Sequence, residues 1–369
     1  MLRIQGGWTI LSYISFLLGL TVIADFKYHV CDFLVCFFII YSIFSYFLFG
    51  DYPVEVFIAS IRDQIFPISF YFFARSKHMR NCDLLQKAII PLMVAYFVGF
   101  VLFFTAPGWY IDYRLGGDYN RTVNGFYEVT RLSSFWTSSY FVGFSALFVI
   151  IYVINRRFID NYVVKNYKTI LVISFLTLFF TQQRISIGFV GLYLIILSLT
   201  LIFKGRLKPI TFIKYFLSAC LLIGIIAILV TFYTDKYYVD YIVGRVTGSE
   251  DGMIEDRVNL FEKYISSISF WGDGMGKYSH NALLYDLPSI TDCEYIRTPN
   301  EIGIFGMILF LLIALLSFLR LIKKRKILCF ESFCLAFFLL AMIGATPLEV
   351  SQQQPFMLWY CIGKIQNYG

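Results

Sequence analysis

Charged residues are scarce in this sequence. Asp, Glu, Lys and Arg together make up 15% of its 369 residues, whereas soluble globular domains carry about 25%. Hydrophobic residues instead reach 59%, the mean hydropathy is +0.70, and the apolar residues are gathered into long runs separated by short basic stretches. A bilayer-spanning helix needs roughly 20 apolar residues in succession. We therefore expect a membrane domain, because a single soluble core has no use for this much apolar material.

Metal-binding and disulfide patterns are also missing. None of the eight cysteines forms a close C-x-x-C pair, and all but Cys293 fall in or beside the apolar runs, so we interpret them as small buried residues. No cluster of carboxylates or histidines suited to a divalent cation stands out, and we expect neither a metal nor another cofactor. The first apolar run begins almost at Met1 without a basic segment or a persuasive cleavage site, and we expect it to be a retained helix.

The apolar runs predict an all-α polytopic membrane protein with about eleven transmembrane helices, in a range of about ten to twelve. The expected helices are 8–24, 30–50, 54–74, 88–105, 138–154, 169–182, 186–203, 211–233, 302–322, 328–345 and 354–368. The sixth and seventh are short and are joined by a tight hairpin. Because no internal repeat and no low-complexity segment is visible, we expect residues 1–369 to form a single membrane domain.

The orientation of these helices follows from the distribution of Lys and Arg. Four short connections are basic and lie on alternate sides of the chain of helices, at 75–87, 156–168, 204–214 and 320–326. Short basic loops stay in the cytoplasm, so the two long connections, 106–137 and 234–301, face the outside, which is the periplasm in a cell with two membranes. This topology explains the net charge of +7 without a nucleic-acid partner.

The first long connection combines aromatic and charged side chains. These are Trp109, Tyr110, Asp112, Tyr113, Arg114, Tyr119, Arg121, Tyr127 and Arg131. Aromatic faces suit sugar rings, and guanidinium groups bind phosphates through several coplanar donors. The same composition also fits an aromatic belt at the membrane interface with ordinary solvated cations, so both interpretations stay open.

The second long connection is more informative. Apolar residues at helical spacing over 253–268 predict an amphipathic helix that lies on the membrane or on the helix bundle and carries Arg257. A glycine-rich turn follows. Ser279 is then a predicted helix cap, which places His280 and Asn281 in the first helical turn, where backbone N–H groups favour an anion. His280 is the only histidine expected on the outer side, although a lone loop histidine is often incidental.

Three further positions attract attention. Residues 298–301 predict a capping box that opens the ninth helix, with Glu301 in a structural role. Arg62 and Asp63 fall near the middle of the third predicted span, where ionised groups are expensive and usually face the interior of the bundle. Arg184 is expected at the outer mouth of the short hairpin.

These features together resemble the superfamily of O-antigen polymerases and O-antigen ligases. The architecture is similar, with ten to twelve spans and two external loops of which the larger comes late. The local matches are Arg131-Leu132-Ser133-Ser134-Phe135, Gln183-Arg184-Ile185-Ser186, Gly244-Arg245-Val246, Asp256-Arg257-Val258-Asn259-Leu260-Phe261, Gly272-x-Gly274, His280-Asn281-x-x-Leu284 and Glu301-x-Gly303-x-x-Gly306. The chain departs from the family pattern at Gln183, where Ser is common, and between Leu284 and Glu301, where it is polar and irregular.

The resemblance implies roles for individual residues. In this superfamily, external arginines engage the pyrophosphate of an undecaprenyl-linked donor, and the histidine of the large loop is functional. By position, the expected catalytic residues are His280, Arg257 and Arg184. By position, Arg131 and Arg245 are expected to bind substrate, and to these we add Arg62, Asn281 and Glu301 as further expected substrate-binding residues.

The resemblance also implies a reaction and a location. An O-antigen polymerase moves the growing glycan from undecaprenyl pyrophosphate onto an incoming undecaprenyl-pyrophosphate-linked repeat unit, at the periplasmic face of the bacterial inner membrane. Its partners are these lipid-linked oligosaccharides, the membrane lipid and a protein that regulates chain length. Two alternatives stay open, which are an O-antigen ligase that transfers the glycan to the lipid A core and a polysaccharide flippase or transporter.

The predicted orientation can be tested by labelling single cysteines from outside the cell, on a background that lacks Cys293. Asn120→Cys lies in the first external connection and is expected to react, whereas Arg80→Cys lies in a cytoplasmic connection and is expected to be protected. Strong labelling at position 80 with none at position 120 would reverse the topology.

Overall fold

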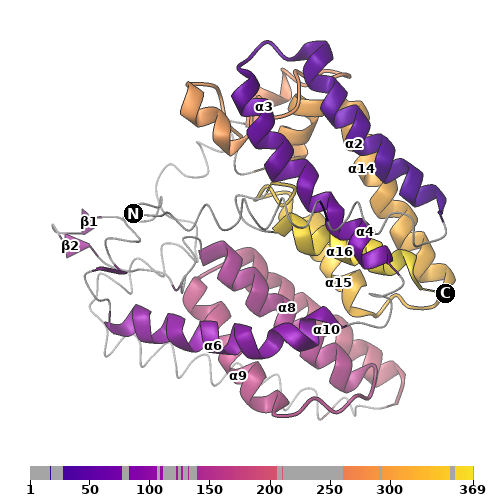
Figure 1. The fold of residues 1–369 in the computed structure, drawn as a ribbon. Coiled ribbons are helices and arrows are strands. Elements are labelled where there is room, and N and C mark those ends of the chain that lie inside the picture. Colours follow the sequence, from indigo (N-terminus) through magenta and orange to yellow (C-terminus); the bar gives the residue numbers. More distant parts are fainter. Residues whose placement is uncertain are drawn as a thin grey trace. The chain divides into compact units, whose positions relative to one another are not determined.

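The fold is known from a computed structural model (Figure 1). It describes residues 17, 28–76, 83–105, 109–110, 122–123, 126–127, 132, 139–205, 210, 261–290, 293–349 and 354–368. The chain divides into two compact units. One comprises residues 1–187 and 267–369, and the other comprises residues 188–266.

Nearly every described element is helical. The helices, in chain order, are α2 (Val30–Phe49), α3 (Val54–Ser60), η2 (Ile61–Ile65), η3 (Phe66–Ile68), α4 (Ser69–Arg75), α6 (Leu84–Thr105), α8 (Ser139–Phe158), α9 (Tyr167–Thr181), α10 (Arg184–Phe203), η4 (His280–Tyr285), α14 (Glu294–Lys323), α15 (Phe330–Ala341) and α16 (Gln354–Gln366). Two short strands, β1 (Thr122–Val123) and β2 (Phe126–Tyr127), pair antiparallel inside the first long connection, a detail that the all-helical prediction did not contain.

Six helices in the described part of the chain are long and apolar enough to cross a membrane. They are Val30–Phe49, Val54–Arg75, Leu85–Thr105, Ser139–Phe158, Arg184–Phe203 and Glu294–Lys323. Helices occupy nine of the eleven predicted ranges, while the expected helix at 211–233 and, apart from residue 17, the one at 8–24 lie outside the described residues. The chain is therefore a helical protein of multi-pass membrane character, and the number of eleven spans stays a prediction.

Helix α2 shows how such a helix divides its surface. Phe33, Phe37, Ile40 and Phe44 recur every three or four residues and are exposed, so they form one apolar face. The residues of the opposite face are buried in the protein, and they are Asp32, Val35, Phe38, Ser42 and Ser45. An exposed apolar face beside a buried polar one is expected where the solvent is lipid, because the hydrophobic effect does not drive these phenylalanines inward.

Several basic helix ends of the larger unit lie together. Arg75, at the end of α4, is buried and contacts Asp32 in the first turn of α2, with Nε 2.9 Å from Oδ1. It also donates to the carbonyl of Gln366 at the end of α16, and Arg320 of α14 donates to the carbonyl of Tyr368. The connections after α4 and α14 therefore leave the same end of this unit, as the predicted topology requires.

The helix Val54–Arg75 is irregular in its middle. Residues 61–65 form a π-helical turn in which the N–H of Phe66 donates to the carbonyl of Ile61, and a 3-10 turn containing Pro67 follows. Proline has no N–H to return to the carbonyl four residues earlier, which here belongs to Asp63. Extra π-turns of this kind bend helices and re-aim their side chains. Arg62, Asp63 and Gln64 all lie in this turn.

Helix α14 is broken near its start. Ile302 and Gly303 leave helical geometry, and Gly303 has a φ of 74°, a conformation that glycine adopts most readily. The segment 269–274 enters the break. Asp273 and Gly274 donate their N–H groups to the carbonyls of Asn300 and Glu301, each at 2.8 Å. On the other side of the break, the N–H groups of Ile304 and Phe305 bond to the carbonyls of Ser269 and Phe270. These four bonds pair backbone groups freed by the break inside the protein, as an apolar surrounding requires.

The predicted capping box at 298–301 is therefore wrong. The helix begins earlier, at Glu294, with Cys293 in the N-cap position, so the large connection ends before residue 301. Thr298 donates its hydroxyl to the Glu294 carboxylate and Glu301 binds side chains of other segments, so neither residue caps a helix. The residues of the predicted capping box lie inside the helix, directly before the break at Ile302 and Gly303.

The break makes a prediction about Gly303. A Cβ at this position would lie 2.2 Å from the carbonyl oxygen of Phe270, and the positive φ is itself unfavourable for alanine. We expect Gly303→Ala to lower the free energy of unfolding by roughly 2–4 kcal/mol, measured by thermal unfolding in detergent.

The matched control is Gly191→Ala in α10, where an added Cβ meets nothing within 4 Å. This substitution is expected to be neutral or to stabilise by about 0.5–1 kcal/mol, because alanine favours the helix. Equal effects of the two substitutions would contradict the packed break.

Candidate functional site

A buried arginine lies at the centre of the larger unit. Arg297 is 1% exposed, and its Nη2 lies 2.6 Å from Glu294 Oε1 while its Nη1 lies 3.0 Å from Glu301 Oε2. The spacing of three and four residues brings these side chains onto one face of α14. The carboxylate of Glu349, from the segment between α15 and α16, lies 3.7 Å from the same Nη1. We call Glu294, Arg297, Glu301 and Glu349 the Arg297 cluster.

Each carboxylate of the cluster also accepts a backbone N–H from a non-helical segment or from η4. Tyr278 donates to Glu301 at 3.2 Å, and Leu348 donates to Glu294 at 3.0 Å. His280 donates its backbone N–H to Glu349 at 2.9 Å. The cluster therefore holds the start of α14 to the segment before η4 and to the connection before α16.

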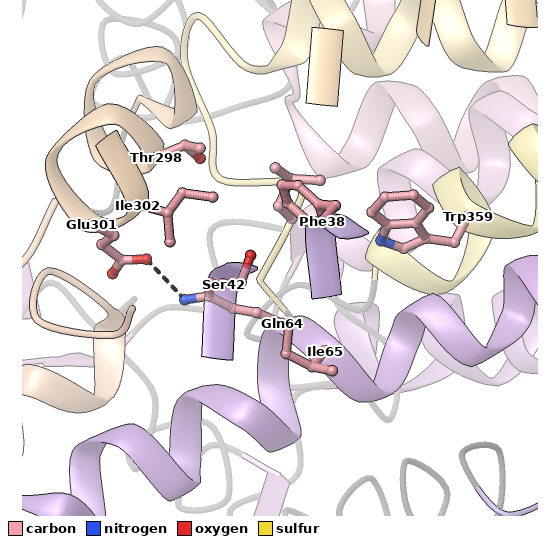
Figure 2. Close-up of a pocket in the computed structure, with 9 residues that line it drawn as sticks. Phe38, Ser42, Gln64, Ile65, Thr298, Glu301, Ile302 and Trp359 are labelled. Atoms are coloured by element: carbon pink, nitrogen blue, oxygen red, sulfur yellow. Dashed lines mark hydrogen bonds between the residues drawn. The ribbon is translucent and has the colours of Figure 1, made fainter. Parts of the chain in front are cut away.

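The π-turn supplies the other half of the site. Gln64 donates from Nε2 to Glu301 Oε2 at 3.0 Å (Figure 2). Its neighbour Asp63 receives two hydrogen bonds from Arg62, at 2.6 and 2.7 Å. Asn281 of η4 donates to Asp63 at 2.7 Å. The π-turn thus joins α14 through Gln64 and joins η4 through Asp63.

Arg62 lies at the edge of this arrangement. Its side chain is 30% exposed, whereas that of Asp63 is 10% exposed. The two hydrogen bonds to one carboxylate fix the plane of the guanidinium group. Arg62 is therefore a preoriented cation that can meet an anion from outside.

A small cavity lies between these elements (Figure 2). It leaves about 10 Å³ for the centres of water molecules, which is room for roughly one water. Its walls are Phe38, Ser42, Gln64, Ile65, Thr298, Glu301, Ile302, Leu348 and Trp359. The cavity is thus apolar on the side of Phe38 and Trp359 and polar on the side of Gln64 and Glu301.

Four of the residues proposed from the sequence come together here. Arg62, Asn281 and Glu301 belong to the hydrogen-bonded network just described, and His280 joins it through its backbone. The side chain of His280 is exposed.

The other residues proposed from the sequence are not among the described members of this network. Arg184 is the first residue of α10 and is exposed; it is not part of the cluster. Arg131, Arg245 and Arg257 lie outside the described residues, as does the first half of the predicted helix 253–268; in its second half, residues 261–265 are helical and 266–268 are not.

The predicted helix start at Ser279 is confirmed in position and corrected in role. Ser279 occupies the N-cap of η4, a 3-10 helix of six residues, but its side chain makes no capping bond. The anion expected at these N–H groups is supplied by the chain itself, because Glu349 binds the N–H of His280. This short helix start is therefore already occupied and is not a ready anion site.

Sequence reasoning missed Glu294, Arg297, Gln64 and Glu349. The signal for the first two was present, since residues 294, 297 and 301 have the spacing of one helical face. That spacing is masked by the polar, irregular composition of the stretch before 302, which is typical of a connection. Gln64 is an uncharged residue beside two charged ones, and Glu349 is a lone acid between apolar runs. Neither carries a pattern that points to Arg297.

The electrostatics of the site centre on Glu349. This residue is 1% exposed, and burial raises the pKa of its carboxyl group from 4.5 to about 7, against the opposing effect of Arg297. The charges of Glu301 and Asp63 raise this pKa further, while the hydrogen bond from His280 lowers it. Within the described part of the chain, His, Cys, Asp and Glu side chains form no group of three suited to a metal ion.

Comparison with models of known protein families and with curated proteins gives no match to this chain. The fold and the site therefore carry the functional argument themselves.

The raised pKa predicts how stability depends on pH. The folded protein holds the Glu349 proton more tightly than the unfolded chain, so this group contributes stability that is present below about pH 4.5 and is lost as pH rises through about 7. The Glu349→Gln variant has no carboxyl group at this position, so it does not lose this stability as the pH rises. We expect the difference in unfolding free energy between variant and wild type to move in favour of the variant by roughly 3 kcal/mol as the pH rises from 4.5 to 8.

Thermal unfolding in detergent at several pH values measures this difference. Glu55→Gln removes an exposed carboxyl group from the first turn of α3, away from the cluster in sequence, and serves as the matched control. A difference between Glu349→Gln and wild type that does not change with pH would contradict the buried, proton-holding carboxyl.

Proposed function

We propose that this protein is an O-antigen polymerase of the bacterial inner membrane. In this proposal it transfers a growing glycan from undecaprenyl pyrophosphate to the incoming lipid-linked repeat unit, at the periplasmic side. The reaction needs cations that stabilise a departing pyrophosphate and a base near the attacking hydroxyl group. It does not need a metal ion if arginines meet the charge.

The observation that carries this proposal is the convergence at Asp63. Arg62 and Asn281, which are more than 200 residues apart in sequence, both bind this carboxylate, and His280 adjoins Asn281 with its side chain exposed. A preoriented guanidinium, an amide and an imidazole thereby occupy one region of the larger unit. The first suits a phosphate, and the last suits a proton transfer near neutral pH.

The proposed step forms one bond and breaks one. A sugar hydroxyl of the incoming unit attacks the anomeric carbon of the growing chain, and the bond from that carbon to the pyrophosphate oxygen breaks with its electron pair on oxygen. The hydroxyl proton passes to His280. Arg62 stabilises the negative charge on the leaving pyrophosphate. Arg131, Arg184, Arg245 and Arg257 are further proposed cations of the same donor site.

A ligase uses the same donor and the same leaving group, so the described residues serve it equally well.

A transporter is favoured by a separate observation. Two spans are irregular, Val54–Arg75 at its π-turn and Glu294–Lys323 at its break, and they meet through Gln64 and Glu301. Interrupted helices that meet inside a membrane protein are typical of transport sites. We keep the transporter as the second candidate.

The phenotype of a clean deletion in the native host separates these functions. Without a polymerase, single repeat units still reach the periplasm and a separate ligase attaches one of them, so gel analysis of lipopolysaccharide should show core plus one unit and no ladder. Loss of a ligase should leave bare core with polymer on its lipid carrier. Loss of a flippase should leave bare core with the repeat unit trapped on the cytoplasmic side. Bare core would overturn the polymerase proposal.

Variants reintroduced into the deletion strain test the site itself. Removal of one donor to a developing oxyanion costs about 10²–10³ in rate, so Arg62→Ala is expected to shorten or abolish the ladder. Arg62→Lys should restore little, because an ammonium group cannot reproduce the planar contact. Arg157→Ala at the end of α8 removes a cation far along the sequence from the site and serves as the control. A wild-type ladder from Arg62→Ala, at equal protein level, would remove Arg62 from the site.

A further inference from the structure

The Arg297 cluster carries more negative than positive charge. It holds three carboxylates and one guanidinium, and all four side chains are at most 2% exposed. Neighbouring Asp63 is balanced by Arg62. With every group ionised, the cluster therefore has two uncompensated negative charges. Uncompensated buried charge is costly, and such groups usually bind a proton instead.

The hydrogen bonds indicate which carboxylate takes the proton. Glu294 accepts from Arg297, from the Thr298 hydroxyl and from the backbone of Leu348. Glu301 also has three donors, from Arg297, Gln64 and Tyr278.

Glu349 is held by far fewer donors. It has one donor, the backbone of His280, and its Oε2 has no hydrogen-bond partner among the described residues, with Arg297 3.7 Å away. An ionised carboxylate needs several donors when it is buried, so Glu349 is the weakest of the three in its charged form.

We propose that the Arg297 cluster is a proton-binding site, in which Glu349 takes up a proton and thereby loosens the segment that carries His280 and Asn281. The ligand is the hydrogen ion, and the carboxylate exchanges it with water. This inference does not rest on the proposed glycan transfer, since it concerns the protein without any substrate.

The adjoining cavity gives water a place beside the cluster. Ser42 and Trp359 line it, are at most 2% exposed, and their Oγ and Nε1 atoms have no hydrogen-bond partner among the described residues. Figure 2 shows both side chains around the same cavity as Gln64 and Glu301. A hydroxyl and an indole N–H that are buried in this way need a polar partner, and the space fits roughly one water molecule. Glu301 then links this cavity through Arg297 to Glu349.

The consequence for His280 follows from the single hydrogen bond. A bond from an N–H to an ionised carboxylate is roughly twice as strong as one to a neutral acceptor. Protonation of Glu349 weakens this bond, while Asn281 stays bonded to Asp63. Residues 278–285 are therefore held more firmly at high pH than at low pH.

Among the described residues, the groups around Glu349 act on its charge in opposite directions. Glu301 and Glu294 of α14 disfavour its ionised form, and Arg297 of the same helix favours it. From the π-turn, Asp63 acts like the other acids and is balanced by Arg62. From η4, the backbone of His280 favours the ionised form. The acids outnumber the cations, which keeps the proton on Glu349 at mildly acidic pH.

The direct test is an infrared pH titration of the purified full-length protein in detergent, without substrate. The carbonyl stretch of a protonated carboxyl group should disappear with a midpoint near pH 7 in the wild type and be missing from Glu349→Gln. The matched control Glu55→Gln should retain it. Glu301→Gln removes a neighbouring negative charge, so the midpoint should fall to lower pH.

Hydrogen exchange of residues 278–285 tests the coupling. After correction for the intrinsic effect of pH, the wild type should exchange at least several-fold faster at pH 5.5 than at pH 8.5, and Glu349→Gln should exchange fast at both. A titrating carboxyl that survives in Glu349→Gln would overturn the proton site. A pH-independent exchange rate in the wild type would overturn the release of the segment. If Glu349→Gln does not fold, an unshifted midpoint in Glu301→Gln overturns the assignment.

Discussion

The guanidinium group of Arg297 is the contact on which this site depends. It is fully buried among Glu294, Glu301 and Glu349, and these carboxylates in turn accept the backbone N–H groups of Tyr278, His280 and Leu348. Removing one partner from such a buried arrangement usually costs far more than the arrangement adds to stability, because it leaves unpaired charges behind. We therefore infer that the main role of the cluster is to position segments of the chain and not to add stability. It fixes where the interrupted start of α14 lies relative to η4 and the segment before α16.

The two irregular spans, Val54–Arg75 and Glu294–Lys323, interrupt regular α-helical hydrogen bonding in different ways. The π-turn in Val54–Arg75 keeps the bond from the N–H of Phe66 to the carbonyl of Ile61 and places Gln64 against α14 and Asp63 against η4. The break at Ile302 and Gly303 gives up helical bonds and replaces them with bonds from the segment 269–274. The four bonds at the break pair backbone groups inside the protein, as an apolar medium requires. Through these irregular segments the polar side chains of two candidate spans meet, at the contact of Gln64 with Glu301.

Much of the fold could be predicted from the sequence, because long apolar runs and short basic connections carry a strong signal. Helices such as Val30–Phe49 and Ser139–Phe158 lie close to their predicted positions. The break in α14 could not be predicted, since Thr298 and Glu301 have the spacing of a capping box and local spacing does not reveal a partner segment. The site was partly predicted. Arg62 was singled out because a mid-span charge is costly, whereas Glu349 acquires its meaning only when tertiary packing brings it to Arg297.

The buried pair of Asp32 and Arg75 has a consequence for biogenesis. Asp32 enters the bilayer in the first turn of α2, but its partner is the last residue of α4 and emerges from the ribosome 43 residues later. Until then an acid near the membrane interface has no arginine beside it, and a lone charge in a span is unfavourable. The hairpin formed by Val30–Phe49 and Val54–Arg75 is the smallest segment in which the two charges cancel. These two helices are thus suited to leave the translocation channel as a pair, and the contact between Asp32 and Arg75 can form before α14 has been synthesised.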